Sequence, residues 1–159
     1  MDPHPSSCEI DITVASPHWQ AAIPGIEELC RATIAAALDG HRSAEVSLLL
    51  ADDAAVQVLN REWRGLDKPT NVLSFPAPPG APALLGDIAL AFETVAREAA
   101  EQGKPLQNHT RHLLVHGVLH LLGYDHEEDE AAERMESRER TILARLAVPD
   151  PYQAERVDG

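Results

Sequence analysis

The sequence predicts a single α/β domain, with a mixed sheet of about four strands packed with five helices. Short segments that have the polar–apolar alternation or the continuous apolar run typical of strands are separated along the chain by longer segments of helical periodicity. The length of 159 residues suits one domain. No run of about 18 apolar residues, as a membrane-spanning helix would need, interrupts this order.

Four segments are typical of strands. The first, EIDITV, alternates polar and apolar residues, and the second, EVSLLLA, has a run of leucines that predicts an interior position in the sheet. The third, TNVLSF, is bracketed by Pro69 and Pro76, and we expect it at an edge because proline cannot donate to a ladder. The fourth is GDIALAF. In chain order these strands cover residues 9–14, 45–51, 70–75 and 86–92.

Five segments have apolar residues at helical spacing. The dipeptide Asp39-Gly40 ends the first, because glycine is the usual residue just past a helix, and Asp52 caps the second. Pro105 suits the first turn of the fourth. The fifth begins with EEDE and carries arginines in its last turns, so both ends suit the helix dipole and the acidic run needs no functional explanation. The helices cover about residues 24–38, 52–62, 93–102, 105–122 and 127–146.

We expect residues 8–146 to form the domain and residues 1–7 and 147–159 to be flexible termini. The N-terminal sequence lacks the positive region and apolar stretch of a secretory signal, which indicates a cytoplasmic protein. Cys8 and Cys30 should then be reduced and buried as small apolar residues.

The most specific stretch of the chain is HGVLHLLGYDH, which begins at His116. His116 and His120 are four residues apart and so share one face of a helix. Gly123 suits a left-handed helix cap, after which the returning chain brings His126 toward the pair. Three neutral imidazoles around zinc leave a fourth position for water, as in hydrolytic sites. We therefore predict that His116, His120 and His126 bind one Zn²⁺ per chain.

The spacing H-x-x-x-H-x-x-G-x-x-H is also that of the metzincin zinc proteases. Those proteases carry their general-base glutamate where this chain has Gly117, which argues against a peptidase. Asp125 could orient one of the ligands or compete as a carboxylate ligand of an iron site. We expect His109 and His112 to lie outside the site, and Met135 to pack in the core.

This stretch resembles the signature of the YbeY family, bacterial rRNA maturation factors described as zinc-dependent endoribonucleases. Residues 59–75, LNREWRGLDKPTNVLSF, resemble the family's second signature, and residues 86–88, GDI, resemble a third. The resemblance extends over about residues 8–146. It implies a zinc-dependent single-strand endoribonuclease that acts in rRNA maturation, at the 3′ end of the small-subunit rRNA, and in ribosome quality control.

The resemblance also implies a catalytic arginine. In the family, the arginine of the R-G-x-D-K-P-T block is thought to take part in catalysis, and it corresponds to Arg64. A guanidinium presents a fork of donors that matches the oxygens of a phosphoryl transition state. We assign catalytic roles to Arg64 and His116, the alternative for Arg64 being a surface ion pair with Asp67. Whether water or the ribose 2′-hydroxyl attacks the phosphodiester stays open.

The formal net charge of −13 is unusual for a protein that binds RNA, because RNA-binding surfaces are normally basic. Arg61, Arg64 and Lys68 form a local cluster of cations that could hold one or two phosphates. We therefore expect single-stranded rRNA to be presented by the ribosome or by small-subunit ribosomal proteins, with no role for DNA or a membrane. Two alternatives remain: a non-catalytic ribosome assembly factor with a structural zinc, and a zinc peptidase.

Overall fold

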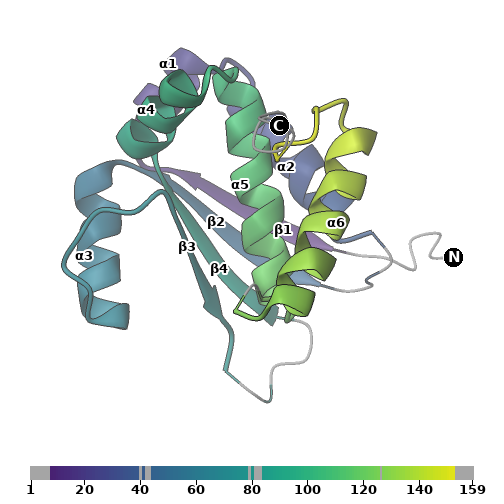
Figure 1. Cartoon of the computed structure of the whole chain (residues 1–159). Helices are drawn as coiled ribbons and strands as arrows, with labels where there is room; N and C mark the ends of the chain where they lie inside the picture. Colours follow the sequence, from purple (N-terminus) through teal and green to yellow (C-terminus); the bar gives the residue numbers. More distant parts are fainter. Residues whose placement is uncertain are drawn as a thin grey trace, which may run out of the picture.

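The computed structural model describes residues 8–39, 41, 44–78, 80, 84–125 and 127–152. This part of the chain forms one α/β domain with a four-stranded sheet and six helices (Figure 1). In chain order the elements are β1 (Glu9–Val14), α1 (His18–Ala22), α2 (Ile26–Ala37), β2 (Glu45–Ala51), α3 (Asp53–Arg64), β3 (Val72–Pro76), β4 (Leu84–Ala91), α4 (Phe92–Gln102), α5 (Leu106–Leu121) and α6 (Asp129–Arg145). None of these helices combines the length and apolar character that crossing a bilayer would need.

The sheet is mixed, as predicted, and its strand order is β1-β2-β4-β3. β1, β2 and β4 are parallel, and β3 is antiparallel to β4. The leucine-rich β2 lies inside the sheet and the proline-bracketed β3 lies at an edge, so both predicted positions are confirmed. β3 begins later than predicted, at Val72, where its pairing with Leu90 of β4 starts, and β4 begins earlier, at Leu84, which pairs with Glu45 of β2.

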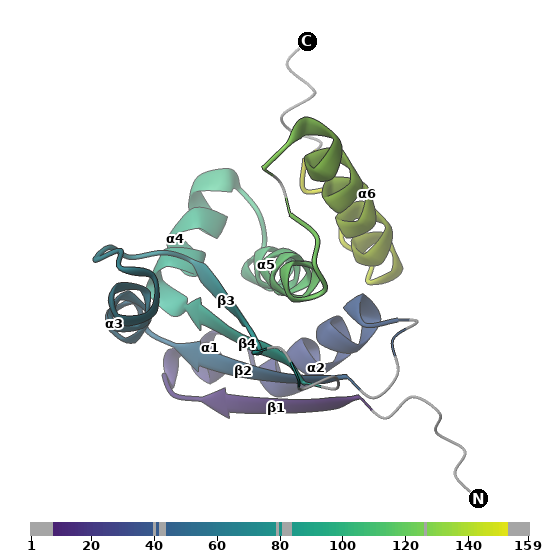
Figure 2. The ribbon, with the colours of Figure 1, turned by 90° about the horizontal axis from the view of Figure 1, so that it is seen from below.

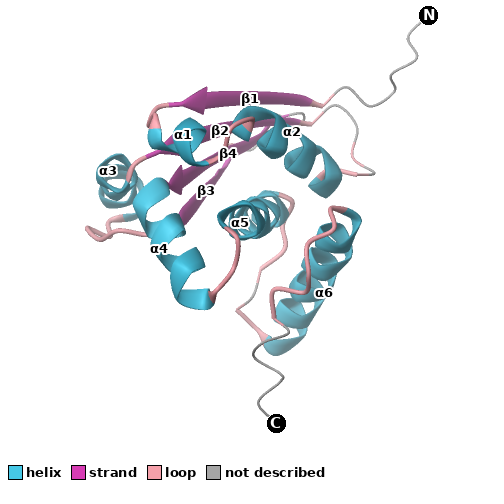
Figure 3. Ribbon diagram, turned by 90° about the horizontal axis from the view of Figure 1, so that it is seen from above, coloured by secondary structure: helices cyan, strands magenta, loops and turns pink. Residues whose placement is uncertain are grey.

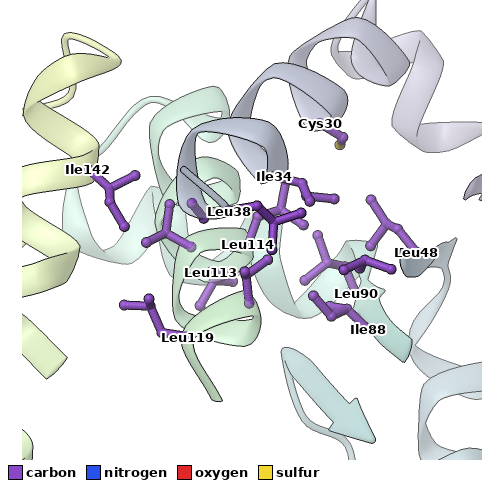
Figure 4. Close-up of a cluster of buried hydrophobic side chains, with 14 of the residues drawn as sticks. Cys30, Ile34, Leu38, Leu48, Ile88, Leu90, Leu113, Leu114, Leu119 and Ile142 are labelled. Carbon is purple, nitrogen blue, oxygen red and sulfur yellow. The ribbon is translucent and has the colours of Figure 1, made fainter. Parts of the chain in front are cut away.

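One face of the sheet carries the main core. Alternate side chains point to this face, among them Leu48 of β2 and Leu90 of β4, and they meet Ile34 of α2 and Leu114 of α5 (Figure 4). Helix α6 packs on the outer side of α5, so α5 lies between the sheet and α6 (Figures 2 and 3). The predicted core position of Met135 is confirmed, because this α6 residue is buried in the same cluster. The histidine-bearing helix is thus enclosed by the sheet, α2 and α6.

The other face of the sheet is covered in part by α3. Val56 of α3 packs with Leu73, Ala89 and Ala91, the residues of β3 and β4 that alternate with those facing the main core. Figure 2 shows α3 and α5 on opposite sides of β3 and β4. The cation cluster at the end of α3 and the histidines of α5 therefore belong to helices on opposite faces.

The described chain has one helix more than predicted. α1 spans only His18–Ala22, too short for apolar periodicity to reveal it. Trp19 is completely buried there, and its indole nitrogen donates to the Ala51 carbonyl oxygen at 2.9 Å. Cys30 is buried as expected, whereas Cys8 is only half-buried, and both are free thiols.

Residues 146–152, which follow α6, pack against the domain, whereas the sequence predicted a flexible terminus from residue 147 onward. Val148 is 7% exposed, and its amide donates to the Leu143 carbonyl at 2.9 Å. Lys104 Nζ donates to the carbonyl oxygen of Pro151 at 3.1 Å. These contacts hold the segment 148–152, which we call the C-terminal strap, against the body of the protein.

Candidate functional site

Helix α5 presents a row of histidines along one side. His109, His112, His116 and His120 follow one another three or four residues apart, the spacing of neighbours on a helix surface. Successive ring centroids lie 6.3, 6.4 and 4.6 Å apart. The row runs from a buried end at His109 to the two rings that the sequence predicted as metal ligands.

His116 and His120 are brought together at the C-terminal end of this row. Their Nε2 atoms lie 3.1 Å apart. Two nitrogens on one tetrahedral zinc, with Zn–N bonds of 2.0–2.1 Å, would be about 3.3 Å apart. Both side chains are half-buried, so a ligand can reach them. The predicted pairing of the two rings is observed, and the separation fits a shared cation.

The turn after α5 has the geometry expected of a glycine cap. Gly123 has a φ of +100°, and its amide donates to the His120 carbonyl at 3.0 Å. The Tyr124 amide donates to the Leu119 carbonyl at 2.9 Å, which completes a Schellman motif. The chain thus leaves the helix at once after His120 and turns back.

The third predicted ligand, His126, lies outside the described residues. Within the described ranges, no three His, Cys, Asp or Glu side chains are arranged to hold a metal ion. The exposed Asp125 accepts the amide hydrogen of Glu127 at 3.2 Å, which gives its carboxylate a role in the turn. The described site therefore contributes two nitrogens, and assignment of all three ligands stays a prediction.

The orientation of His116 depends on Glu139 of α6. Glu139 is completely buried, and its Oε2 lies 2.6 Å from His116 Nδ1. Because an ionised carboxylate only accepts hydrogen bonds, Nδ1 carries the hydrogen and donates it. A neutral His116 then has its lone pair on Nε2, the atom beside His120. This arrangement of carboxylate and histidine is typical of metal sites.

The other oxygen of Glu139 has two further donors. The Tyr152 hydroxyl donates to Oε1, and His112 Nε2 lies 3.3 Å from the same atom. Burial raises the pKa of the Glu139 carboxyl, but the hydrogen bonds from His112, His116 and Tyr152 outweigh burial and lower this pKa to about 2. Glu139 is therefore a carboxylate at neutral pH, despite its burial.

The sequence did not indicate Glu139 as part of the site. Glu139 belongs to the acidic fifth helix, for which the sequence indicated no functional role, yet it lies four residues after Met135 and three before Ile142, both of which are buried. A glutamate within the apolar stripe of α6 was the available signal. His112 was expected outside the site, and its contact with Glu139 makes it part of the same network.

His109 belongs to a separate network at the other end of the row. Its Nε2 lies 2.9 Å from Glu98 Oε1, which also accepts a hydrogen bond from Asn71 Nδ2 at 2.9 Å. Burial lowers the pKa of His109 below its usual 6.5, and the Glu98 carboxylate offsets only part of this effect. The network links α4 and α5 to the residue that precedes β3, and His109 lies outside the histidine pair, as expected.

Gly117 faces the sheet. A Cβ atom at this position would lie 3.2 Å from Ser74 Oγ and 3.3 Å from two carbons of Ile88. The Ser74 hydroxyl also donates to the Gly117 carbonyl at 3.3 Å. A glutamate here, as in the metzincin motif, would be directed into packed β-sheet, so this position has no room for a general base.

Arg64 ends α3 and is exposed. Asp67, its suggested ion-pair partner, instead accepts a hydrogen bond from Gln57 Nε2 at 3.0 Å, and Arg64 has no ion pair within the described part of the chain. The neighbouring Trp63 is 72% exposed and lies near Phe75 of β3. No described hydrogen bond or ion pair joins Arg64 to the histidine pair, and the helices that carry them, α3 and α5, lie on opposite sides of β3 and β4 (Figure 2).

The fold and the site define a mixed α/β protein in which one helix presents paired histidines held by a buried carboxylate. The chain belongs to the endoribonuclease YbeY family, whose model matches residues 12–147, as the resemblance predicted. A relative from Paramagnetospirillum magneticum, named endoribonuclease YbeY, is 54% identical over 158 residues that cover 91% of this chain and 95% of the relative. One of the same name from Rhodopseudomonas palustris is 53% identical over 152 residues, covering 89% and 90%.

A solved structure supports the fold separately. The solution structure of a protein from Thermotoga maritima matches 94% of this chain and 99% of its own, with a TM-score of 0.56 and 22% sequence identity. This likeness concerns the arrangement of helices and strands.

Proposed function

We propose that this protein is a zinc-dependent single-strand endoribonuclease that acts in rRNA maturation, at the 3′ end of the small-subunit rRNA, and in ribosome quality control. Its relatives carry the name endoribonuclease. The observation that carries the metal part of the proposal is the 3.1 Å separation of the His116 and His120 Nε2 atoms, with Nδ1 of His116 held by Glu139.

In this proposal His116, His120 and His126 hold one zinc ion. When bound, zinc would supply Lewis-acid polarisation of a phosphodiester oxygen. Glu139 keeps the hydrogen of His116 on Nδ1, so that the lone pair of Nε2 is available to bind the metal. Gly117 counts against peptidase chemistry, because its position faces the sheet and could not carry a general base toward a substrate.

We propose that Arg64 binds the non-bridging oxygens of the phosphate, for which a guanidinium is well suited. α3 and α5 lie on opposite faces, so an RNA that contacts both Arg64 and the histidines has to pass around β3 at the sheet edge. A flexible single strand can bend in this way more easily than a duplex. This geometry favours single-stranded RNA as the substrate.

The net charge of −13 favours delivery of the RNA by a larger assembly over capture from solution. We propose the ribosome, or small-subunit ribosomal proteins, as this partner, and a cytoplasmic location. The same charge also favours a second candidate, a non-catalytic assembly factor whose metal is structural. In that case removal of zinc would lower thermal stability without abolishing any reaction.

Cleavage of a precursor RNA that carries the small-subunit rRNA 3′ end tests the proposal. The wild type is compared with His120→Ala and with His41→Ala, a control at an exposed histidine whose described hydrogen bonds are made by its own backbone atoms, to the Leu38 carbonyl and from the Cys8 thiol. We expect the wild type and His41→Ala to cut the RNA, a chelator to stop both, and His120→Ala to be inactive.

Equal cutting by His120→Ala would mean that the histidine pair is not the catalytic site. If no protein cuts, but the wild type holds one zinc and associates with ribosomal subunits, the assembly-factor function is the better account.

A further inference from the structure

We propose that Tyr152, in the C-terminal strap, is a positioning residue for the histidine pair, because its hydroxyl holds the buried carboxylate that orients His116. Tyr152 lies outside residues 12–147, the part of the chain that matches the family model. The inference rests on the proposed function in one respect, namely that the pair binds a metal ion.

The fold of the strap directs Tyr152 back to α5 and α6. Ala147 has a φ of 62°, which turns the chain at the end of α6, and Val148 is then buried. Asp150 Oδ1 accepts the Tyr152 amide hydrogen at 2.8 Å, and its Oδ2 lies 4.0 Å from Arg140 Nε. Together with the bond from Lys104 to the strap, these contacts fix the backbone on both sides of the turn.

The side chain of Tyr152 has two partners in the Glu139 network. Its hydroxyl donates to Glu139 Oε1, and His112 Nε2 lies 3.3 Å from the hydroxyl oxygen. The phenol ring also packs edge-on against the His112 ring, with centroids 5.5 Å apart and an interplanar angle of 86°. The ring and the hydroxyl of Tyr152 therefore make separable contributions.

The Tyr152 hydroxyl determines which donor bonds to which oxygen of the Glu139 carboxylate. Oε1 takes the hydrogen from Tyr152, and Oε2 takes the hydrogen from His116 at 2.6 Å. Without the hydroxyl, Oε1 keeps only the longer contact with His112 at 3.3 Å. The carboxylate can then rotate toward His112, and His116 loses the fixed acceptor that keeps its Nε2 beside that of His120.

The test uses Tyr152→Phe, which keeps the ring and removes only the hydroxyl. Tyr124→Phe, at the chain's other tyrosine, is the matched control, since Tyr124 has no described hydrogen bond from its hydroxyl. Zinc affinity of the full-length protein is measured by competition with a chromophoric chelator. The visible spectrum of the cobalt-loaded protein reports ligand geometry, and the melting temperature of the metal-free protein reports packing.

Loss of an outer-shell partner typically weakens metal binding 10–100-fold, and Tyr152 acts one bond further out, so we expect a loss of about threefold to tenfold. We also expect the cobalt spectrum to change in Tyr152→Phe and to stay the same in Tyr124→Phe. Unchanged zinc affinity and cobalt spectrum in Tyr152→Phe, with or without a lower melting temperature, would overturn the inference and leave the proposed function standing.

If the wild type binds no zinc, both the inference about Tyr152 and the proposed metal site are refuted. Zinc binding that weakens in Tyr152→Phe, in a protein that does not cut RNA, would support the inference while contradicting the nuclease function.

Discussion

Replacement of Glu139 by methionine tests the central contact of the site. The substitution keeps an unbranched side chain of similar size in the α6 core and removes the acceptor of three donors, on His112, His116 and Tyr152. Each hydrogen bond to a charged group contributes about 1.5–3 kcal/mol, whereas removal of a buried charge returns several kcal/mol of desolvation cost. The opposing effects leave an expected decrease of about 2–4 kcal/mol in the unfolding free energy of the metal-free protein.

Zinc affinity should fall in the same variant. Without Glu139, the hydrogen of His116 can move to Nε2, the atom that would bind the metal, and we expect a loss of about 10–100-fold. The assays are urea unfolding followed by circular dichroism, and chelator competition for zinc. Glu136→Met is the matched control: it lies on the same helix, 38% exposed, and its ion pair with Arg140 at 4.0 Å should contribute less than about 0.5 kcal/mol.

The reasoning is refuted if Glu139→Met unfolds like the control and binds zinc within about twofold of the wild type, a difference below about 0.5 kcal/mol. A loss of stability with unchanged zinc affinity would mean that Glu139 contributes to the packing of α6 and not to metal binding.

Further expectations concern the two ends of the histidine row, its glycine and the cation cluster. His120→Ala should reduce bound zinc, measured by elemental analysis, well below one per chain; full retention would place the ligands elsewhere. Arg64→Glu should abolish RNA cleavage while zinc content and melting temperature stay nearly unchanged, and a collapse in melting temperature would make Arg64 structural. Gly117→Glu should destabilise the fold by about 3 kcal/mol or more, because it directs a carboxylate into packed sheet; a wild-type melting temperature would contradict the close contact with β3 and β4. The lowered pKa of His109 means that the unfolded chain takes up its proton first as pH falls below 6.5, so this residue lowers stability toward acid. His109→Gln should flatten the acid side of the stability–pH curve, and an unchanged slope would argue against this.

The sequence predicted those parts of the fold that depend on local patterns. The bounds of β1 and β2 match because alternation and a leucine run mark them. The starts of β3 and β4 differ by about two residues, because β3 starts where it pairs with Leu90 of β4, and β4 starts where it pairs with Glu45 of β2. α1 was missed because five residues are too few to show a helical period.

The site was predicted in part for similar reasons. The four-residue spacing was enough to bring His116 and His120 together, since helix geometry alone does so. The role of Glu139 depends on how α6 packs on α5. Because α6 carries many acidic residues, the sequence does not show that Glu139 is the buried one. The position of Arg64 relative to the pair depends on which face of the sheet α3 covers, and no spacing within the chain reveals that.

The two tryptophans of the chain lie in opposite environments, since Trp19 of α1 is completely buried and Trp63 at the end of α3 is 72% exposed. Intrinsic fluorescence should therefore contain a blue-shifted component that acrylamide reaches poorly and a red-shifted component that it quenches readily. The first reports on the integrity of the core and the second on events at the cation cluster. Folding and ligand contact can thus be followed in the same unlabelled sample, without an added dye.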